Sequence, residues 1–213
     1  MPIDKILPII FSGVMPTAIL DDRKTETRRV MKPQPTIETL IAESCEPGWH
    51  GYAPDQEQPE DISYTGTTWR CPYGVPGDRL WVRETWMPVY IPRAGREGIC
   101  YKSDHAIHQC RHETSVWTMD RAGKWRSPIY MPRWASRITV EITNVAVERV
   151  QDISVEDVWA EGIDFRSCAF PTDKFHTHWD SLNAKKGHGW DENDWVWVLT
   201  FKRCNLQQGR RTK

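Results

Sequence analysis

The chain has 213 residues, of which 39% are hydrophobic and 27% charged, as in folded globular proteins rather than disordered chains. A formal net charge of -1 at pH 7 excludes a protein that coats nucleic acid or binds membranes by bulk electrostatics. Any contact with nucleic acid must therefore come from a local basic patch.

The sequence contains no apolar stretch of transmembrane length, and its start lacks the pattern of a signal peptide. The six cysteines are scattered and form no CxxC pair, which indicates free thiols in a reducing compartment. We therefore expect a cytoplasmic protein without a membrane partner. Twelve tryptophans exceed what a core of this size usually needs, so some are expected to line a groove where flat rings stack on bases.

Alternating or continuous apolar runs predict the β-strands. The predicted strands span residues 7–11, 25–30, 79–86, 138–142 and 195–201, and the pattern of the fourth can continue through Val145 and Val147. Few of them are separated by a helix in the way that a parallel α/β sheet requires. The pattern therefore predicts a mostly β (α+β) protein, a small mixed or partly open β-barrel with helices capping it.

Helices are predicted at three places. Pro16 suits the first turn of a helix that ends near Leu20. Ser154 and Asp157 have the spacing of a capping box, and the helix that they open is expected to end at Gly162. A third helix is predicted around residues 175–182, where Phe, Trp and Leu recur at helical spacing.

Two polar segments interrupt this pattern, at about 34–68 and 87–128, and are interpreted as loop insertions. The polar, basic tail at 205–213 is expected to fray. The organisation is thus a single domain over residues 1–204 with two insertions, followed by a tail.

The segment at 23–29 concentrates charge: Arg23-Lys24-Thr25-Glu26-Thr27-Arg28-Arg29 holds four cations, one carboxylate and two hydroxyls. Lys24 lies where a loop enters the predicted strand, and the strand alternation puts Thr27 and Arg29 on one face and Glu26 and Arg28 on the other. Such a cluster suits an anionic or carbonyl-bearing ligand. Composition alone favours the alternative, a solvated edge strand protected by Lys.

The segment Arg83-Glu84-Thr85-Trp86 places Arg83 and Glu84 on opposite faces of one strand, so one charge must point inwards and needs a partner. A ligand site and an internal Arg–Glu network both explain it. Glu161 is predicted in the last turn of a helix, where the negative end of the dipole favours proton uptake and suits a general base. The alternative is an ordinary exposed Glu at a helix end.

A group of metal-ligand residue types lies at Cys100, His105, His108, Cys110 and His112. Their spacing matches no common zinc pattern, so a His-bearing surface loop explains them better than a metal site. No Walker loop, GxGxxG or GxSxG motif is present. We expect no metal and no cofactor.

Several segments together carry a resemblance to a known family. They are Ile10-Phe11-Ser12-Gly13 with Ala18-Ile19-Leu20, Arg23 to Arg29, Cys71-Pro72-Tyr73-Gly74 with Gly77 to Trp86, Met131 to Ile138, Asp152-Ile153-Ser154 with Ala160-Glu161-Gly162, and Trp195 to Phe201. The chain resembles the ASCH domain family of the PUA-like superfamily, in particular its larger members from bacteriophages and prophages. The resemblance covers most of residues 7–203 except the two insertions.

This resemblance implies a PUA-like β-barrel with a cleft for RNA or a modified nucleoside. Some small bacterial members hydrolyse the acetyl group of 4-acetylcytidine with a Lys, a Thr and a Glu. Those residues match Lys24, Thr27 and Glu161, which makes them the catalytic candidates. The ligand-binding candidates are Arg23, Arg28, Arg29, Arg83, Glu84 and Trp86.

The small enzymes are about half as long as this chain and lack both insertions, so the resemblance predicts the pocket better than the substrate. The alternatives are a non-catalytic module that binds RNA or modified nucleic acid, a ribonuclease, and a phage accessory protein that acts by protein contact through an exposed Trp patch.

Overall fold

A computed structural model describes residues 5–35, 40–43, 49–52, 68–91, 96–109, 123–163 and 170–204. The helices are α1 (Met15–Leu20), α2 (Val155–Ala160) and α3 (Pro171–Asn183). The strands are β1 (Ile6–Ile10), β2 (Glu26–Val30), β3 (Leu40–Glu43), β4 (Trp49–Tyr52), β5 (Thr68–Trp69), β6 (Arg79–Arg83), β7 (Trp86–Ile91), β8 (Arg96–Tyr101), β9 (Ile107–Gln109), β10 (Thr139–Arg149) and β11 (Trp195–Arg203). Short 3-10 helices lie at Pro128–Tyr130, Arg133–Ala135, Val150–Asp152, Ala184–Lys186 and Trp190–Glu192.

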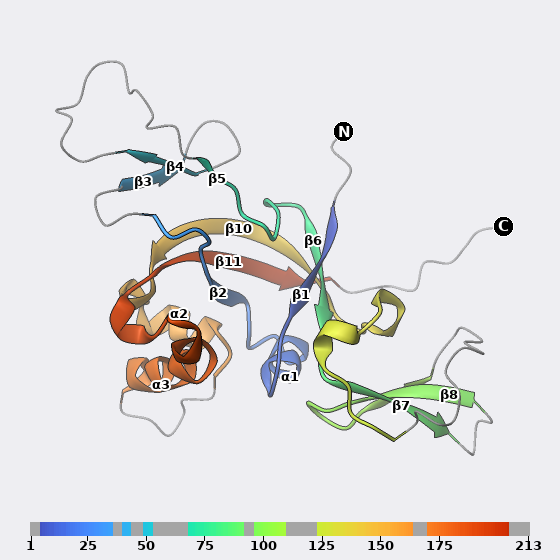
Figure 1. The fold of residues 1–213 in the computed structure, drawn as a ribbon. Helices are drawn as coiled ribbons and strands as arrows, with labels where there is room; N and C mark the ends of the chain where they lie inside the picture. The colour runs from blue at the N-terminus through green and yellow to red at the C-terminus, as the bar shows by residue number, and fades with distance from the viewer. Residues whose placement is uncertain are drawn as a thin grey trace.

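The centre of the fold is a curved sheet of five strands in the order β1-β6-β10-β11-β2 (Figure 1). Strands β1 and β6 are parallel, and the other neighbours are antiparallel. The predicted mostly β architecture with flanking helices is therefore confirmed. The barrel is not closed, however, because no pairing among the described residues joins β1 to β2. Helix α1 connects these two edge strands, and its Met15 and Ile19 are buried in the core.

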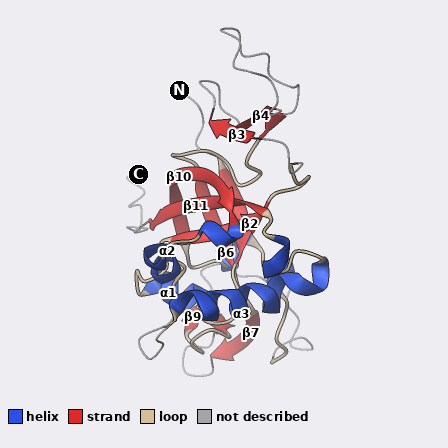
Figure 2. Ribbon diagram, turned by 90° about the vertical axis from the view of Figure 1, so that its left-hand side faces the viewer, coloured by secondary structure: helices blue, strands red, loops and turns tan. Residues whose placement is uncertain are grey.

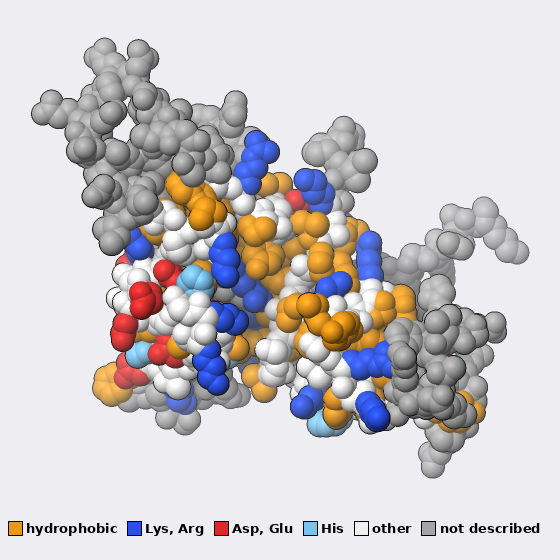
Figure 3. Space-filling view, in the orientation of Figure 1, with side chains coloured by type: hydrophobic (Ala, Val, Ile, Leu, Met, Phe, Trp, Pro, Cys, Tyr) orange, Lys and Arg blue, Asp and Glu red, His pale blue; other side chains and the backbone are white. Residues whose placement is uncertain are grey.

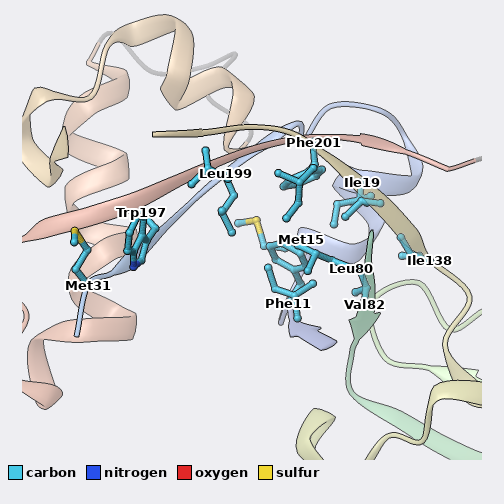
Figure 4. Close-up of a cluster of buried hydrophobic side chains, with 14 of the residues drawn as sticks. Phe11, Met15, Ile19, Met31, Leu80, Val82, Ile138, Trp197, Leu199 and Phe201 are labelled. Carbon is cyan, nitrogen blue, oxygen red and sulfur yellow. The ribbon is translucent and has the colours of Figure 1, made fainter. Parts of the chain in front are cut away.

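Strand β11 is buried on both faces, which explains its continuous apolar sequence. Trp197, Leu199 and Phe201 point into the main core, where they lie with Phe11, which follows β1, and with residues of α1 and β6 (Figure 4). The alternate residues Val196 and Val198 pack against α2 and α3 on the opposite face. Figures 1 and 2 both show these helices on one side of the sheet.

The local signals for the helices are confirmed. Pro occupies the first turn of α1, and the capping box of α2 is complete, with the Ser154 hydroxyl accepting from the Asp157 N–H at 3.1 Å. Helix α2 ends before Gly162, which has a φ of +78°. The predicted strand at 79–86 is wrong in its extent, because it divides at Glu84 and Thr85 into β6 and β7, which belong to different sheets.

The two insertions were predicted as loops, and this is wrong where the structure describes them. The segment at 87–128 contributes β8, β9 and most of β7 to a three-stranded antiparallel sheet in the order β7-β8-β9. The segment at 34–68 contributes β3, β4 and the start of β5 to another, in the order β3-β4-β5. Because these segments are rich in turn-forming residues, their short strands give no clear pattern in the sequence. The strands are stabilised by pairing with one another. The predicted tail at 205–213 lies outside the described residues. No helix in the described part of the chain is long and apolar enough to cross a membrane.

Candidate functional site

The open side of the sheet, between edge strands β1 and β2, contains a cavity of about 360 Å³. Its walls come from the end of β1, from β2, from the end of α2 and from α3 and the segment that follows it. In Figure 3, Lys and Arg side chains gather along the boundary between the part formed by α2 and α3 and the rest of the molecule. The residues that line the cavity are Ile10, Phe11, Ser12, Met15, Lys24, Thr27, Arg28, Arg29, Val30, Lys32, Tyr73, Glu161, Phe175, His178, Trp179, Leu182, Asn183, Lys186 and His188.

Lys24 lies in this cavity wall with only 3% of its surface exposed. Its Nζ donates to Oε2 of Glu161 at 2.6 Å, to the Glu161 carbonyl at 2.8 Å and to the Glu26 carbonyl at 2.7 Å. The three hydrogens of an ammonium group thus each have an acceptor. Burial lowers the pKa of Lys24, and the carboxylate of Glu161 opposes this shift.

Glu161 is the residue that follows α2, and its backbone forms an antiparallel bridge with Lys24. Its Oε1 accepts from the backbone N–H of Arg28 at 2.7 Å, so both carboxylate oxygens are engaged. The bridge depends on Gly162, because a Cβ there would lie 2.5 Å from the Cβ of Lys24. Glu161 is therefore a buried member of the site and not an exposed residue at a helix end.

Thr27 is buried in the middle of β2, opposite Leu199 of β11. It lines the same cavity as Lys24 and Glu161. Within the described part of the chain, no hydrogen bond engages its hydroxyl, and that oxygen is not fully enclosed. The three catalytic candidates are thus brought together, with a hydroxyl at the cavity wall beside a buried ion pair.

Arg28 points to the other face of β2, as the strand alternation predicts. Its guanidinium contacts the carboxylates of Glu148 at 2.6 Å, Glu26 at 2.7 Å and Asp157 at 3.2 Å, and lies 3.5 Å from Glu161. Burial alone would lower the pKa of Arg28, but these carboxylates raise it. The side chain therefore ties β2 to β10 and α2, and the expectation of a solvated edge strand is wrong although β2 does lie at the sheet edge.

Arg29 and Arg23 differ in position. Arg29 lines the cavity, stacks over Phe11 at 5.1 Å and donates from Nη2 to the Ile10 carbonyl at 2.6 Å, which spans the gap between β2 and β1. Burial lowers its pKa. Arg23 is exposed, contacts Asp21 and the Gly162 carbonyl, and does not line the cavity.

The other three ligand-binding candidates lie away from this cavity. Arg83 stacks over Trp81 at 4.6 Å, and Trp86 is fully buried with Arg126 over its ring at 5.2 Å. Glu84 is buried and receives two hydrogen bonds from Arg137, at 2.9 and 3.0 Å. The internal Arg–Glu network that the sequence left open is thus present, with Arg137 in place of Arg83.

Glu84 also lines a second cavity of about 340 Å³, together with Lys102 and Ser103 from the turn after β8. The two cavities share Phe11 and Ser12 at the end of β1.

Sequence reasoning missed the wall that α3 contributes. His178 and Trp179 line the cavity, as do residues further along this segment. A signal was available, because His178 falls at the helical spacing of Phe175, Trp179 and Leu182 and is the polar residue on that stripe. Burial lowers the pKa of His178; Lys24 adds to this shift and Glu161 opposes it.

A histidine–aspartate pair lies beside this wall. The Nδ1 of His188 is 2.6 Å from Oδ2 of Asp194, and His188 lines the cavity. Its carbonyl accepts from the indole N–H of Trp179 at 2.9 Å, which holds the segment after α3 against the helix. The pair therefore orients an imidazole at the cavity edge.

The cysteine and histidine group at 100–112 lies in the β7–β9 region. Cys100 is buried with its sulfur 3.7 Å from the His105 carbonyl, and His108 packs edge-on against Tyr101. Cys110 and His112 lie outside the described residues. Among the residues that are described, no group of three His, Cys, Asp or Glu side chains has the arrangement of a metal site. Cys71, Cys100 and Cys204 are free thiols.

The chain was compared with protein families, curated proteins and solved structures. No protein-family model and no curated protein matches the chain. The chain is similar to the crystal structure of an ASCH domain from Lactobacillus crispatus JV V101, with 11% sequence identity and a TM-score of 0.42. The similarity covers 93% of this chain and 79% of that one. The solved domain carries the name of the family that the sequence motifs resemble, the ASCH domain family.

Proposed function

We propose that the cavity binds a nucleoside, free or within RNA, and that Lys24, Thr27 and Glu161 hydrolyse an amide on its base, such as the acetyl group of 4-acetylcytidine. The observation that carries this proposal is the buried pair of Lys24 and Glu161, 2.6 Å apart, in the wall of a cavity that Thr27 also lines. A buried, charge-paired Lys and Glu in a cleft is the kind of perturbed arrangement that marks functional sites.

The cavity suits such a ligand in size and in chemistry. Its volume of about 360 Å³ falls in the usual range for small-molecule sites. Tyr73 offers aromatic surface for a base, and Lys32 and Lys186 offer cations for ribose or phosphate oxygens. This charge is local, consistent with a chain whose net charge is -1.

Amide hydrolysis needs a nucleophile, a group that takes its proton, and stabilisation of the oxyanion. The Thr27 hydroxyl is the nucleophile or holds the attacking water. In one arrangement the ion pair stays intact, Lys24 stabilises the oxyanion by its charge, and Glu161 accepts the proton. In the other, the proton has moved to Glu161, and the neutral amine of Lys24 is the base.

The test is turnover of 4-acetylcytidine by the purified protein, followed as release of cytidine by liquid chromatography. We expect Thr27→Val to lower kcat/KM by about 100-fold or more, since a catalytic hydroxyl is lost. Thr25→Val is the matched control, because Thr25 is exposed just before the same strand and does not line the cavity. Wild-type turnover no faster than that of Thr27→Val contradicts the proposal.

A second candidate function is non-catalytic binding of the same ligand class. The observation that favours it is the complete set of acceptors around Lys24, because a saturated ammonium is also what a purely structural ion pair needs. Calorimetric titration with cytidine separates the two: binding without turnover of 4-acetylcytidine supports the binder. Turnover that depends on Thr27 supports the enzyme.

A further inference from the structure

The hydrogen bonds of the Lys24–Glu161 ion pair bear on which group takes the proton of the attacking oxygen in the proposed hydrolysis. Each N–H of Lys24 already has an acceptor, and each oxygen of Glu161 already has a donor. An ionised Lys has no lone pair with which to accept a proton. The Glu161 carboxylate keeps free lone pairs, but protonating it would remove the negative charge that balances the buried Lys24 ammonium. The ion pair therefore stays intact only if another group in the cavity is the base.

His178 is the unengaged imidazole in the cavity wall. In the described part of the chain no hydrogen bond or ion pair is found for its ring. The neighbouring histidines differ, because His176 pairs with Asp180 at 3.0 Å and His188 with Asp194 at 2.6 Å. A half-buried polar ring that lines a cavity and has no partner among the described residues is placed to meet a ligand.

The surroundings of His178 favour the neutral imidazole at neutral pH. Burial lowers its pKa below 6.5, and Lys24 adds to this effect while Glu161 opposes it. The other charged or titratable groups that line the same cavity are Arg28, Arg29 and Lys32 of β2 and the residues after it, Tyr73, and Lys186 and His188 after α3. A neutral imidazole has one ring nitrogen with a lone pair and one with a hydrogen, so it can both accept and donate.

We propose that His178 is the proton-transfer residue of this cavity. The proposal rests on the proposed amide hydrolysis, but in place of Glu161 or Lys24 it makes His178 the base. His178 takes the proton from the attacking oxygen while the new C–O bond forms, and it returns that proton to the amide nitrogen while the C–N bond breaks. The amine leaves neutral. With water as the attacking group the acyl product is a carboxylic acid. With Thr27 as the attacking group it is an ester on Thr27, which a water deprotonated by His178 then hydrolyses to the acid, and the proton returns to the Thr27 oxygen. Lys24 and Glu161 remain an ion pair throughout.

The kinetic test compares His178→Gln with His176→Gln, which lies on the same helix but outside the cavity lining. We expect His178→Gln to lower kcat/KM for 4-acetylcytidine by about 100-fold or more, and His176→Gln to change it by less than about twofold. Wild-type kcat/KM should fall as the pH drops through the lowered pKa of His178, and this acid limb should be absent in His178→Gln.

Wild-type turnover with an unchanged rate and acid limb in His178→Gln overturns the role of His178 and leaves the proposed function standing. Absence of wild-type turnover overturns both.

A binding measurement supplies a readout that does not depend on the variant folding. In wild-type protein with isotope-labelled histidine, cytidine is titrated while the imidazole resonances are followed by NMR. We expect the ring of His178 to shift on saturation and that of His176 to stay unchanged. Cytidine that shifts the resonance of His188 but not that of His178 overturns the proposal, because the proton-transfer residue must contact the ligand.

Discussion

The Nζ of Lys24 and the Oε2 of Glu161 lie 2.6 Å apart although the two residues are separated by 137 positions in the sequence. The backbones of the same two residues form a β-bridge, so the side-chain contact is built on a main-chain contact. This double attachment holds the end of α2 against the start of β2 and places both groups in the cavity wall. The same contact between two chain segments therefore fixes the positions of Lys24 and Glu161 and pairs their charges.

The first prediction concerns the energy of this buried pair. Glu161→Gln leaves the Lys24 ammonium without a charged partner, and Lys24→Met leaves the carboxylate with donors from Arg28 alone. We expect each change to lower the free energy of unfolding by about 3 kcal/mol. The double variant should lose clearly less than the sum, as measured by urea denaturation. Additive losses would show that the two groups do not stabilise one another.

The second prediction concerns Gly162, where both the backbone and the space require glycine. Its φ is +78°, and a Cβ would lie 2.5 Å from that of Lys24 and 3.0 Å from that of Ala18. Gly162→Ala should cost about 2–4 kcal/mol from the left-handed backbone and from overpacking. It should also displace Lys24 and reduce activity or ligand affinity.

Gly187→Ala is the control for Gly162→Ala, since its φ is +77° but no atom lies within 4 Å of the added Cβ. Equal losses of stability in the two variants would assign the whole effect to the backbone conformation. A Gly162→Ala structure with Lys24 unmoved would contradict the predicted displacement.

The third prediction separates two adjacent lysines after α3. Lys186 lines the cavity and Lys185 does not, although both are exposed. We expect Lys186→Ala to weaken binding of cytidine 5′-monophosphate by about threefold at low salt, and this effect to shrink at high salt. Lys185→Ala should leave the affinity unchanged. Calorimetry at two salt concentrations makes the comparison, and equal effects of both variants would indicate non-specific attraction.

The fourth prediction concerns Trp86, which sequence reasoning placed in the ligand site. The ring is fully buried, packs in a cluster with Ile99, Tyr101 and Met131, and does not line the cavity. Trp86→Ala should therefore lower the free energy of unfolding by about 3–5 kcal/mol. The milder Trp86→Phe should keep nucleoside affinity within about twofold of wild type. A large loss of nucleoside affinity in a stable Trp86→Phe protein would show that Trp86 does contribute to ligand binding.

Local periodicity was enough to predict much of the scaffold. The alternation in β2 and β10, the continuous apolar run of β11 and the capping box of α2 depend on neighbouring residues, so their physical causes are contained in short segments. The same alternation correctly separated Arg28 from Thr27 and Arg29. It did not reveal the strands in the insertions, because β8 and β9 are short and are stabilised by pairing with each other.

The sequence by itself thus determined the main strands and the helix ends, and through the resemblance it proposed Lys24, Thr27 and Glu161 as the site. Only the tertiary structure decided that β1 and β2 do not pair and that α3 contributes a wall of the cavity with His178. It also decided that Arg28 forms ion pairs with carboxylates from β10 and α2. The physical reason is that these features arise from the approach of segments distant in the chain, and burial and ion pairing become defined only when the partners are in place.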